Sequence, residues 1–196
     1  MSKILITGAT GFLGSKILIR LISEGYKVVA LVREQSNLSR IKTVVNEVDL
    51  FYLGKNNSNL NELFENENID TIIHTATEYG RESLNSDILM TNLIFPIKLI
   101  ETGLKNGLKN FINSDTFFGK PKFFNAVYLN QYSSSKKYFL DYLFSQRENL
   151  KSVNLRLEHI FGEFDSHTKF VTNILQRLLK SDIEISLTDG VQKRDF

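Results

Sequence analysis

Three glycines at a spacing of three constrain this chain more than any other feature of its sequence. They are Gly8, Gly11 and Gly14, in a segment that reads Thr7-Gly8-Ala9-Thr10-Gly11-Phe12-Leu13-Gly14. A short apolar run at residues 4–7 leads into them, and helical spacing of apolar residues begins at Phe12. A strand, a glycine turn and a helix in this order are typical of a dinucleotide site, because glycine permits the tight turn and the helix N-terminus attracts a pyrophosphate.

The same change from strand pattern to helix pattern recurs along the chain. Short apolar runs predict strands at residues 4–7, 27–32, 48–52, 71–74, 111–113 and 153–157. Helical spacing predicts helices from Phe12 to Gly25 and at 38–45, 60–64, 84–106 and 131–146, with a kink at Pro96. This alternation predicts an α/β fold of the Rossmann type, a doubly wound parallel sheet with its ligand crevice at the carboxyl ends of the strands.

The composition argues against several classes of function. With 24 Lys and Arg against 22 Asp and Glu, the net charge of +2 does not favour nucleic-acid or membrane binding. The chain has no cysteine, and His159 and His167 follow far along the chain from His74, so we expect no metal site. The first apolar run is too short for a signal peptide or a membrane span. We therefore expect a cytoplasmic protein.

The end of the second predicted strand bears on the choice of cofactor. Rossmann folds that prefer NAD place a carboxylate there to bind the ribose 2′-hydroxyl, whereas this chain has Val32 followed by Arg33. A guanidinium at this position can bind the 2′-phosphate of NADP, with Ser36 and Arg40 as helpers. We expect NADP, and NAD stays open because Glu34 could still reach the ribose.

A tyrosine and a lysine four residues apart are candidates for proton transfer. Tyr132 and Lys136 lie on one face of a predicted helix, where the ammonium together with a cationic nicotinamide would lower the pKa of the phenol. Ser114 follows the strand at 111–113, so its hydroxyl can polarise a substrate carbonyl at the crevice. The same spacing also arises by chance in helices, and Ser114 could merely complete a turn.

These three features, in this order, resemble the NAD-dependent epimerase/dehydratase family, extended short-chain dehydrogenases that act on nucleotide sugars. The resemblance covers nearly the whole chain, with further matches at residues 70–77, 92, 155–162 and 192–196. It implies a nucleotide-sugar substrate, and a homodimer formed through the helices at 84–106 and 131–146.

The motif and the resemblance together predict two groups of binding residues. The cofactor contacts are Gly8, Thr10, Gly11, Phe12, Leu13, Gly14, Arg33, Thr75, Ala76, Thr77, Asn92, Tyr132 and Lys136. The substrate contacts are Tyr79, Arg81, Asp115, Thr116 and Arg194, of which Arg194 would hold the nucleotide diphosphate. Tyr79 and Arg81 could instead serve only packing and solvation.

Within the family, residues 74–81 and 113–118 look most like CDP-abequose synthase and related 4-keto-6-deoxysugar reductases of surface polysaccharide pathways. In the family's 4,6-dehydratases an Asp-Glu pair follows the active-site hydroxyl, whereas here Asp115 is followed by Thr116. A threonine cannot act as the base that an elimination needs. We therefore expect an NADP(H)-dependent reductase. The alternatives are a nucleotide-sugar epimerase with bound NAD and a catalytically inactive dinucleotide-binding protein or truncated remnant.

The resemblance also predicts two parts of the chain. Residues 1–163 would form the NAD(P)-binding Rossmann domain, and residues 164–196 would begin a substrate-binding lobe that the chain leaves incomplete. Helical spacing from Phe170 to Leu179 predicts a helix in that second part. A lobe cut short there would leave some of its apolar surface exposed.

Overall fold

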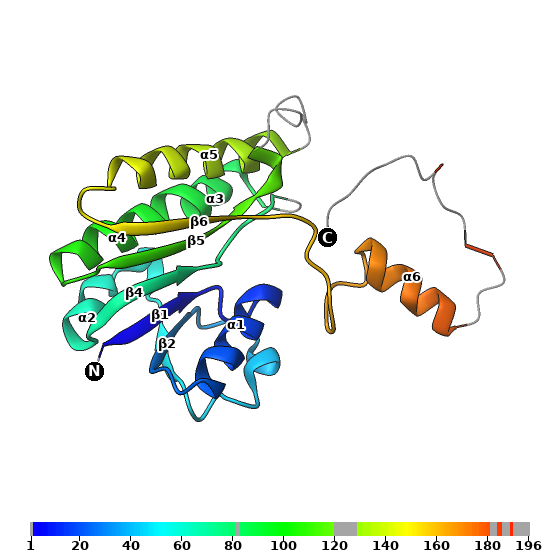
Figure 1. Cartoon of the computed structure of the whole chain (residues 1–196), viewed down its shortest axis with the longest axis horizontal. Helices are drawn as coiled ribbons and strands as arrows, with labels where there is room; N and C mark the ends of the chain where they lie inside the picture. The colour runs from blue at the N-terminus through cyan, green and yellow to red at the C-terminus, as the bar shows by residue number, and fades with distance from the viewer. Residues whose placement is uncertain (1, 81–82, 120–128, 181–183, 186–188, 190–196) are drawn as a thin grey trace. The chain divides into compact units, whose positions relative to one another are not determined.

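The computed structural model describes residues 2–80, 83–119, 129–180, 184–185 and 189, and in this part of the chain six strands form one sheet (Figure 1). The strand order is β3-β2-β1-β4-β5-β6, and β1–β2, β1–β4, β2–β3 and β4–β5 pair in parallel. The strands are β1 (Lys3–Thr7), β2 (Val28–Val32), β3 (Asp49–Tyr52), β4 (Ile69–His74), β5 (Asn110–Thr116) and β6 (Lys151–Leu157). The strand order reverses between β1 and β4, and sheets of this kind bind their ligands at the carboxyl ends of the strands next to such a reversal.

The helices follow the predicted order, with shorter bounds in places. The α-helices are α1 (Phe12–Ser23), α2 (Leu60–Asn66), α3 (Asn85–Leu89), α4 (Phe95–Lys105), α5 (Asn130–Ser145) and α6 (Phe170–Leu179). Single 3₁₀ turns are η1 (Leu38–Ile41), η2 (Lys55–Asn57) and η4 (Phe117–Gly119). The helix predicted at 38–45 is reduced to η1, and the β-branched run Thr43-Val44-Val45 that follows disfavours its continuation.

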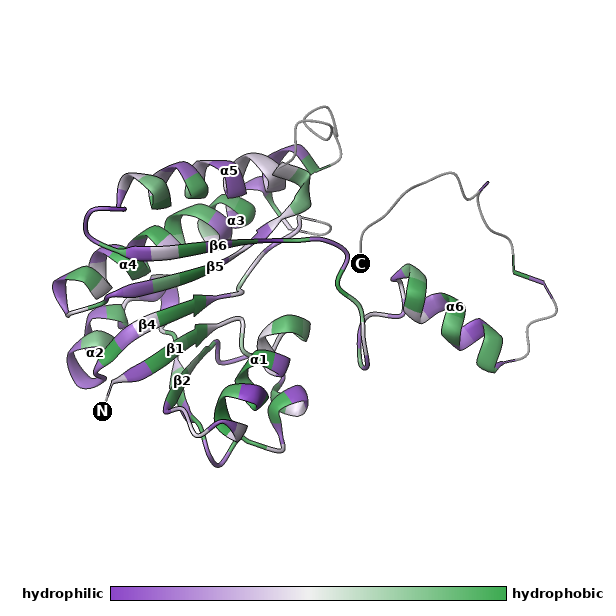
Figure 2. Cartoon of the chain, viewed as in Figure 1, coloured by the Kyte–Doolittle hydropathy of each residue, from purple (hydrophilic) through white to green (hydrophobic). Residues whose placement is uncertain are grey.

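Two apolar clusters cover the two faces of the sheet. On β1, Ile6 packs in one cluster with Leu18 of α1, whereas the adjacent Leu5 packs in the other with Leu99 of α4 and Phe139 of α5. Successive residues of a strand point to opposite faces, so helices cover both sides, and Figure 2 shows the apolar strands between amphipathic helices. Each fully buried leucine or phenylalanine side chain contributes about 1.5–3 kcal/mol to the free energy of folding. The strand order confirms the predicted doubly wound sheet.

A π-helical segment interrupts the long helix that the sequence predicts at 84–106. This segment, η3 (Met90–Ile94), joins α3 to α4, and Pro96 lies in the first turn of α4. Proline lacks the N–H that an α-helix needs and its ring crowds the carbonyl four residues earlier, so the wider turn falls just before it. The predicted break at Pro96 is thus a π segment, and it buries Asn92 completely.

Contacts divide the chain into two compact units, Met1–Arg156 and Leu157–Phe196. In the second unit α6 buries none of its residues, and Phe170, Leu175, Leu178 and Leu179 are exposed. The predicted boundary after residue 163 remains a prediction.

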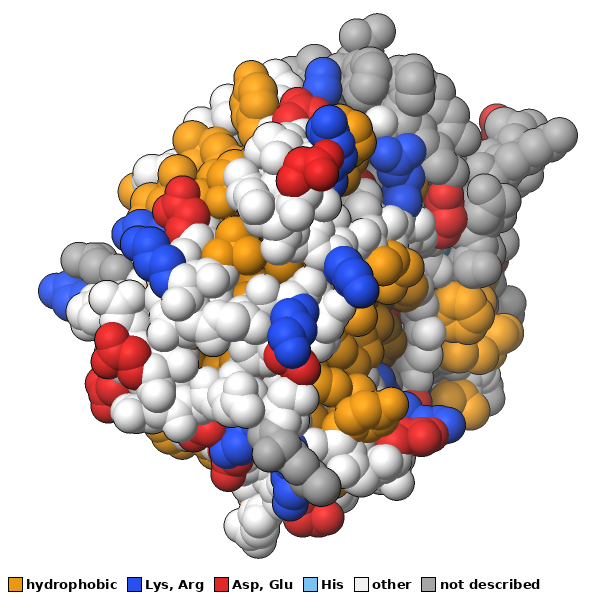
Figure 3. All heavy atoms as spheres, turned by 60° about the vertical axis from the view of Figure 1, so that its left-hand side comes forward, with side chains coloured by type: hydrophobic (Ala, Val, Ile, Leu, Met, Phe, Trp, Pro, Cys, Tyr) orange, Lys and Arg blue, Asp and Glu red, His pale blue; other side chains and the backbone are white. Residues whose placement is uncertain are grey.

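Within the described residues, no helix combines the length and apolarity that crossing a membrane requires. Acidic and basic side chains are interspersed on the face shown in Figure 3.

Candidate active site

The turn between β1 and α1 has room only for glycine at two positions. Gly8 has φ +68°, and a Cβ there would lie 2.7 Å from the backbone nitrogen of Ala76. A Cβ on Gly14 would lie 2.1 Å from the carbonyl oxygen of Gly8. The amide of Gly11 donates to that same oxygen at 2.9 Å, which closes the turn. The backbone at the start of α1 is therefore packed directly against the end of β1, a cradle that fits a dinucleotide pyrophosphate.

The loop after β4 lies against this turn. Thr75 donates its hydroxyl to the Thr7 carbonyl at 2.7 Å, and the Ala76 amide donates to the Thr7 hydroxyl at 3.3 Å. The Thr77 hydroxyl donates to the Asn92 side-chain oxygen at 3.2 Å. The predicted contacts at 75–77 and 92 are thus brought together beside the glycine turn.

The segment after β2 reaches the same turn. Arg33 is exposed, and its amide donates to the Ser36 hydroxyl at 2.9 Å. The Arg40 guanidinium donates to the carbonyl of Thr10 at 3.5 Å. The structure therefore joins the arginine-bearing segment to the glycine turn that precedes Phe12 and Leu13.

The three predicted proton-transfer residues meet at the carboxyl ends of β4 and β5. Tyr132 and Lys136, both on α5, are 4% and 3% exposed. The Lys136 ammonium donates to the Ser114 carbonyl at 3.1 Å, and the Ser114 hydroxyl donates to the His74 carbonyl at 2.9 Å. To polarise a substrate carbonyl, the Ser114 hydroxyl has to rotate away from that backbone oxygen.

Burial dominates the electrostatics of Lys136. Removal from water lowers the pKa of the Lys136 ammonium to about 8, and the negative charge of Asp115 acts in the opposite direction. The lysine therefore titrates near neutral pH, and its charge depends on the neighbouring carboxylate.

The phenol of Tyr132 lies in an environment that disfavours its ionisation. Burial raises the pKa of Tyr132, the nearby Tyr79 raises it further, and hydrogen bonds with Thr116 and Thr77 act the other way without offsetting the rise. The sequence predicts a lowered pKa when the Lys136 ammonium and a bound nicotinamide act together. In the chain alone the pKa of Tyr132 is raised instead, because removal of the phenol from water dominates. The Lys136 ammonium is directed to the Ser114 carbonyl.

Asp115 is held within the sheet rather than in the pocket. Its carboxylate accepts a hydrogen bond from the Asn154 side chain at 2.9 Å and lies 3.8 Å from Nε of Arg156. The Asn154 side-chain oxygen in turn accepts from Asn113 at 2.7 Å. The predicted substrate contacts Arg81 and Arg194 lie outside the described residues.

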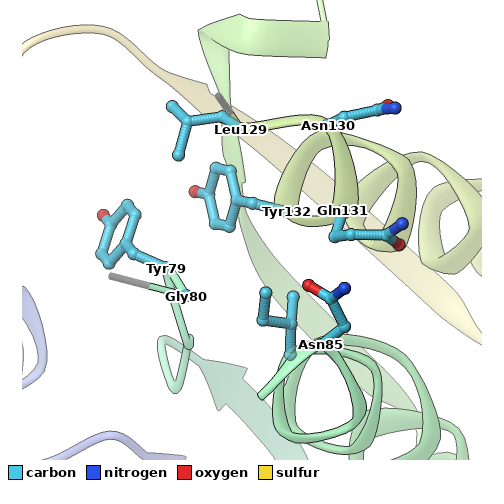
Figure 4. Close-up of a pocket in the computed structure, with 8 residues that line it drawn as sticks. Tyr79, Gly80, Asn85, Leu129, Asn130, Gln131 and Tyr132 are labelled. Atoms are coloured by element: carbon cyan, nitrogen blue, oxygen red, sulfur yellow. The ribbon is translucent and has the colours of Figure 1, made fainter. Parts of the chain in front are cut away.

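A pocket of about 310 Å³ opens beside Tyr132. It lies between the loop after β4, α3 and the start of α5 (Figure 4). Its lining consists of Tyr79, Gly80, Asn85, Ile88, Leu129, Asn130, Gln131 and Tyr132. Polar amides and two phenols on a partly apolar wall suit a sugar ring, which presents hydroxyls and C–H faces together.

Sequence reasoning missed two residues that shape the site. Ser135, fully buried on α5, accepts a hydrogen bond from the Asn92 side chain at 3.2 Å and donates to the Tyr132 carbonyl at 2.8 Å. Glu78 bonds Asn92 through both its amide and its carbonyl, at 2.8 and 2.9 Å. Ser135 is three residues from Tyr132 and so shares its helix face, a signal that could have identified it.

His74 has a structural position. It is fully buried, its Nδ1 lies 2.8 Å from the Thr7 hydroxyl, and its ring packs among Phe95, Phe111 and Phe139. Burial and the nearby Lys136 charge hold its pKa well below the usual value. Across the described residues no group of three His, Cys, Asp or Glu could hold a metal ion.

Comparisons with known proteins agree with this arrangement. The model of the NAD dependent epimerase/dehydratase family matches residues 4–196. CDP-abequose synthase of Salmonella muenchen is 33% identical over 199 residues, which cover 99% of this chain and 65% of that protein.

Solved structures show the same likeness. UDP-glucose 4-epimerase of Thermotoga maritima, solved with UDP-glucose, has 25% identity and a TM-score of 0.72 over 91% of this chain and 63% of that one. The Bordetella bronchiseptica enzyme WbmH, solved with NAD+, shares the fold at a TM-score of 0.73 and 23% identity, over 92% of this chain and 64% of its own. The chain spans less than two thirds of the length of each of these three proteins. It belongs to the NAD dependent epimerase/dehydratase family.

Proposed function

We propose that the protein is an NADP(H)-dependent reductase of a nucleotide-linked 4-keto-6-deoxysugar, in the synthesis of a surface polysaccharide. The observation that carries this proposal is the meeting of Ser114, Tyr132 and Lys136 at the end of β5, beside a glycine turn and a pocket. The similarity to CDP-abequose synthase over 99% of the chain supports it.

The reduced nicotinamide supplies the hydride for the keto carbon. Tyr132, which burial keeps protonated, donates its proton to the keto oxygen. Ser114 rotates from the His74 carbonyl to donate to that same oxygen, which stabilises the charge that develops there. Lys136 holds the nicotinamide ribose and stabilises the Tyr132 phenolate. Thr116 has no carboxylate with which to remove a C–H proton, which favours reduction over elimination.

The charges after β2 support NADP. The buried Val32 offers no carboxylate to repel a 2′-phosphate, and the exposed Arg33 follows it directly. Arg40, bonded to Thr10 of the glycine turn, supplies a second guanidinium in the segment after β2. A guanidinium binds phosphate through paired hydrogen bonds, so two of them at this position favour the phosphorylated ribose.

A second candidate is a nucleotide-sugar epimerase with tightly bound NAD. The likeness to the Thermotoga maritima UDP-glucose 4-epimerase favours it, since the same tyrosine, lysine and hydroxyl can serve oxidation and re-reduction at one carbon. The two functions differ in how firmly the cofactor must be retained, because an epimerase regenerates its cofactor in each cycle and a reductase exchanges it.

We also propose a homodimer in the cytoplasm. Tyr138 and Phe144 on α5 are 60% and 66% exposed, and exposed aromatic side chains are enriched at interfaces between subunits. A second copy of the chain packed on α5 would bury them.

Calorimetric titration with NADPH and, separately, NADH tests the proposal. We expect tighter binding of NADPH, and NADPH binding weaker by about tenfold to a hundredfold in Arg33→Ala with NADH binding unchanged, since one charge-assisted contact is worth about 1.5–3 kcal/mol. Lys42→Ala, on the segment just past η1, is the control. Equal affinity for both cofactors contradicts the NADP assignment, and NAD that stays with the purified protein favours the epimerase.

A further inference from the structure

One wall of the pocket beside Tyr132 is a turn formed by Tyr79 and Gly80, the 79–80 turn (Figure 4). Tyr79 is 51% exposed, and its ring stacks on that of Tyr132 with centroids 4.9 Å apart. Gly80 has no side chain with which to pack. The shape of this wall therefore depends largely on what holds the backbone of the turn.

The carboxylate of Glu78 closes the turn. Its Oε1 accepts a hydrogen bond from the Gly80 amide at 3.0 Å, so the side chain of the residue before Tyr79 reaches the residue after it. A bond from a backbone amide to a carboxylate is charge-assisted and stronger than a bond between two neutral groups. It fixes the backbone on both sides of Tyr79.

Asn92 anchors Glu78 itself. The Asn92 side-chain oxygen accepts from the Glu78 amide at 2.8 Å and from the Thr77 hydroxyl at 3.2 Å. Its side-chain nitrogen donates to the Glu78 carbonyl at 2.9 Å and to the Ser135 hydroxyl at 3.2 Å. An asparagine side chain can donate two hydrogen bonds and accept two, so these four bonds use its full capacity. The backbone of Glu78 is thus fixed to a completely buried residue.

The other side of the turn rests on α3. Gly80 has φ +78°, a left-handed conformation that favours glycine, and a Cβ there would lie 2.4 Å from Cδ1 of Ile88. Ile88 is 4% exposed and also lines the pocket. The 79–80 turn therefore lies between a carboxylate that bonds its amide and a buried isoleucine that limits its approach to the helix.

We propose that Glu78 is a positioning residue for the sugar, a role that rests on the proposed reductase function. Its carboxylate holds the 79–80 turn as a fixed wall of the pocket. Glu78 acts through that turn, since it is not itself among the described residues that line the pocket. The wall sets how tightly the sugar binds, whereas proton transfer depends on Tyr132 and Lys136.

Kinetics of Glu78→Ala and Glu78→Gln test this role. Alanine removes the acceptor, so the KM for the keto-sugar nucleotide should rise about tenfold, as expected when water only partly replaces a hydrogen bond to a charged group. The kcat and the Kd of NADPH should stay near their wild-type values. Glutamine keeps an oxygen that can accept from the Gly80 amide, so it should restore most of the wild-type KM. Glu65→Ala, at an exposed glutamate of α2, is the control.

A second pair of substitutions tests the same wall from the side of α3. Gly80→Ala should also raise the KM, because the added Cβ does not fit against Cδ1 of Ile88. Ile88→Val removes that Cδ1, so the double variant should recover part of the loss, while the strain of the left-handed backbone remains. Ile88→Val alone completes the cycle. No recovery in the double variant would contradict a wall held against Ile88.

Hydrogen exchange at the Gly80 amide checks the bond without turnover. This amide should exchange about tenfold faster in Glu78→Ala than in the wild type, and near the wild-type rate in Glu78→Gln. An unchanged exchange rate or an unchanged KM in Glu78→Ala overturns the proposal. A matching loss of NADPH binding also overturns it, because the change then affects the whole unit. If the wild type reduces no keto-sugar nucleotide, the reductase function fails and the sugar role fails with it, while exchange separately decides whether Glu78 holds the turn.

Discussion

A buried ammonium is the most sensitive single group in this site. Lys136 is almost completely removed from water. The carboxylate of Asp115 favours the charged form of the lysine, whereas the buried His74 nearby stays neutral. Because burial has already lowered its pKa to about 8, a small change in local charge alters its protonation at physiological pH. Arg156 and Asn154 hold the carboxylate of Asp115 in place, so β6 acts on the site through that carboxylate.

Asp115→Asn should therefore move the pH profile. The charged form of Lys136 is present below its pKa of about 8 and is lost above it, so kcat/KM for NADPH should fall on the alkaline side near that pH. Removing the carboxylate lowers the pKa further, and the alkaline limb should move to lower pH by about one unit. Asp115→Glu, which keeps the charge, should leave it near the wild-type position. An unmoved limb in Asp115→Asn would show that another group controls it.

The same lysine links protonation to folding. Its pKa in the folded chain lies below the ordinary lysine value of 10.5, so the unfolded chain binds more protons between pH 8 and 10.5, and folding stability rises with pH across that window. A lysine buried for its chemistry thus weakens the fold at neutral pH.

At the scale of an element, the glycine turn shows how packing overrides local preference. Alanine at position 14 should gain about 1 kcal/mol in helix propensity, because Gly14 lies in the first turn of α1. The added Cβ, 2.1 Å from a backbone oxygen, forces the helix away from the strand, and overpacking of this kind costs about 1–3 kcal/mol. Gly14→Ala should therefore lower the melting temperature and abolish NADPH binding.

A second glycine, just past the same helix, provides the matched control. Gly25 follows the end of α1 with φ +80°, and a Cβ there would have no neighbouring atom within 4 Å. Gly25→Ala should cost about 1–2 kcal/mol for the left-handed conformation alone and keep NADPH binding. Thermal unfolding and calorimetry measure both variants. Full cofactor binding in Gly14→Ala would contradict the close packing of α1 on the turn.

Local patterns explain why the strands and the glycine turn were predictable, and long-range bonds explain why the contacts of Asn92 were not. The turn is encoded within eight residues, and each strand within one apolar run. Asn92 bonds Glu78, 14 residues away, and Ser135, 43 residues away. The π segment that buries Asn92 has only Pro96 as its signal. The bond from Asn154 to Asp115 likewise joins residues 39 positions apart, and the role of Asp115 as a substrate contact stays a prediction.

At the scale of the whole molecule, all predicted cofactor contacts belong to one compact unit. The glycine turn, the loop at 75–77 and the two α5 residues lie within Met1–Arg156, and α6 lies within Leu157–Phe196. A ligand stabilises the unit that binds it according to its concentration relative to its Kd. The two units should therefore respond differently to NADPH.

Hydrogen exchange with and without NADPH measures that difference. At a free concentration of about 100 times Kd, binding stabilises the folded first unit by about 2.7 kcal/mol, so its slowest amides should exchange roughly a hundredfold more slowly. We expect this protection in β1, β4 and α5, with the largest effect at the amides of Gly11 and its neighbours. Amides of α6 should exchange at the same rate with and without cofactor, and NADH at the same concentration should protect less. Equal protection of α6 would mean that the two units open as one, and the cofactor would then stabilise the chain as a single cooperative body.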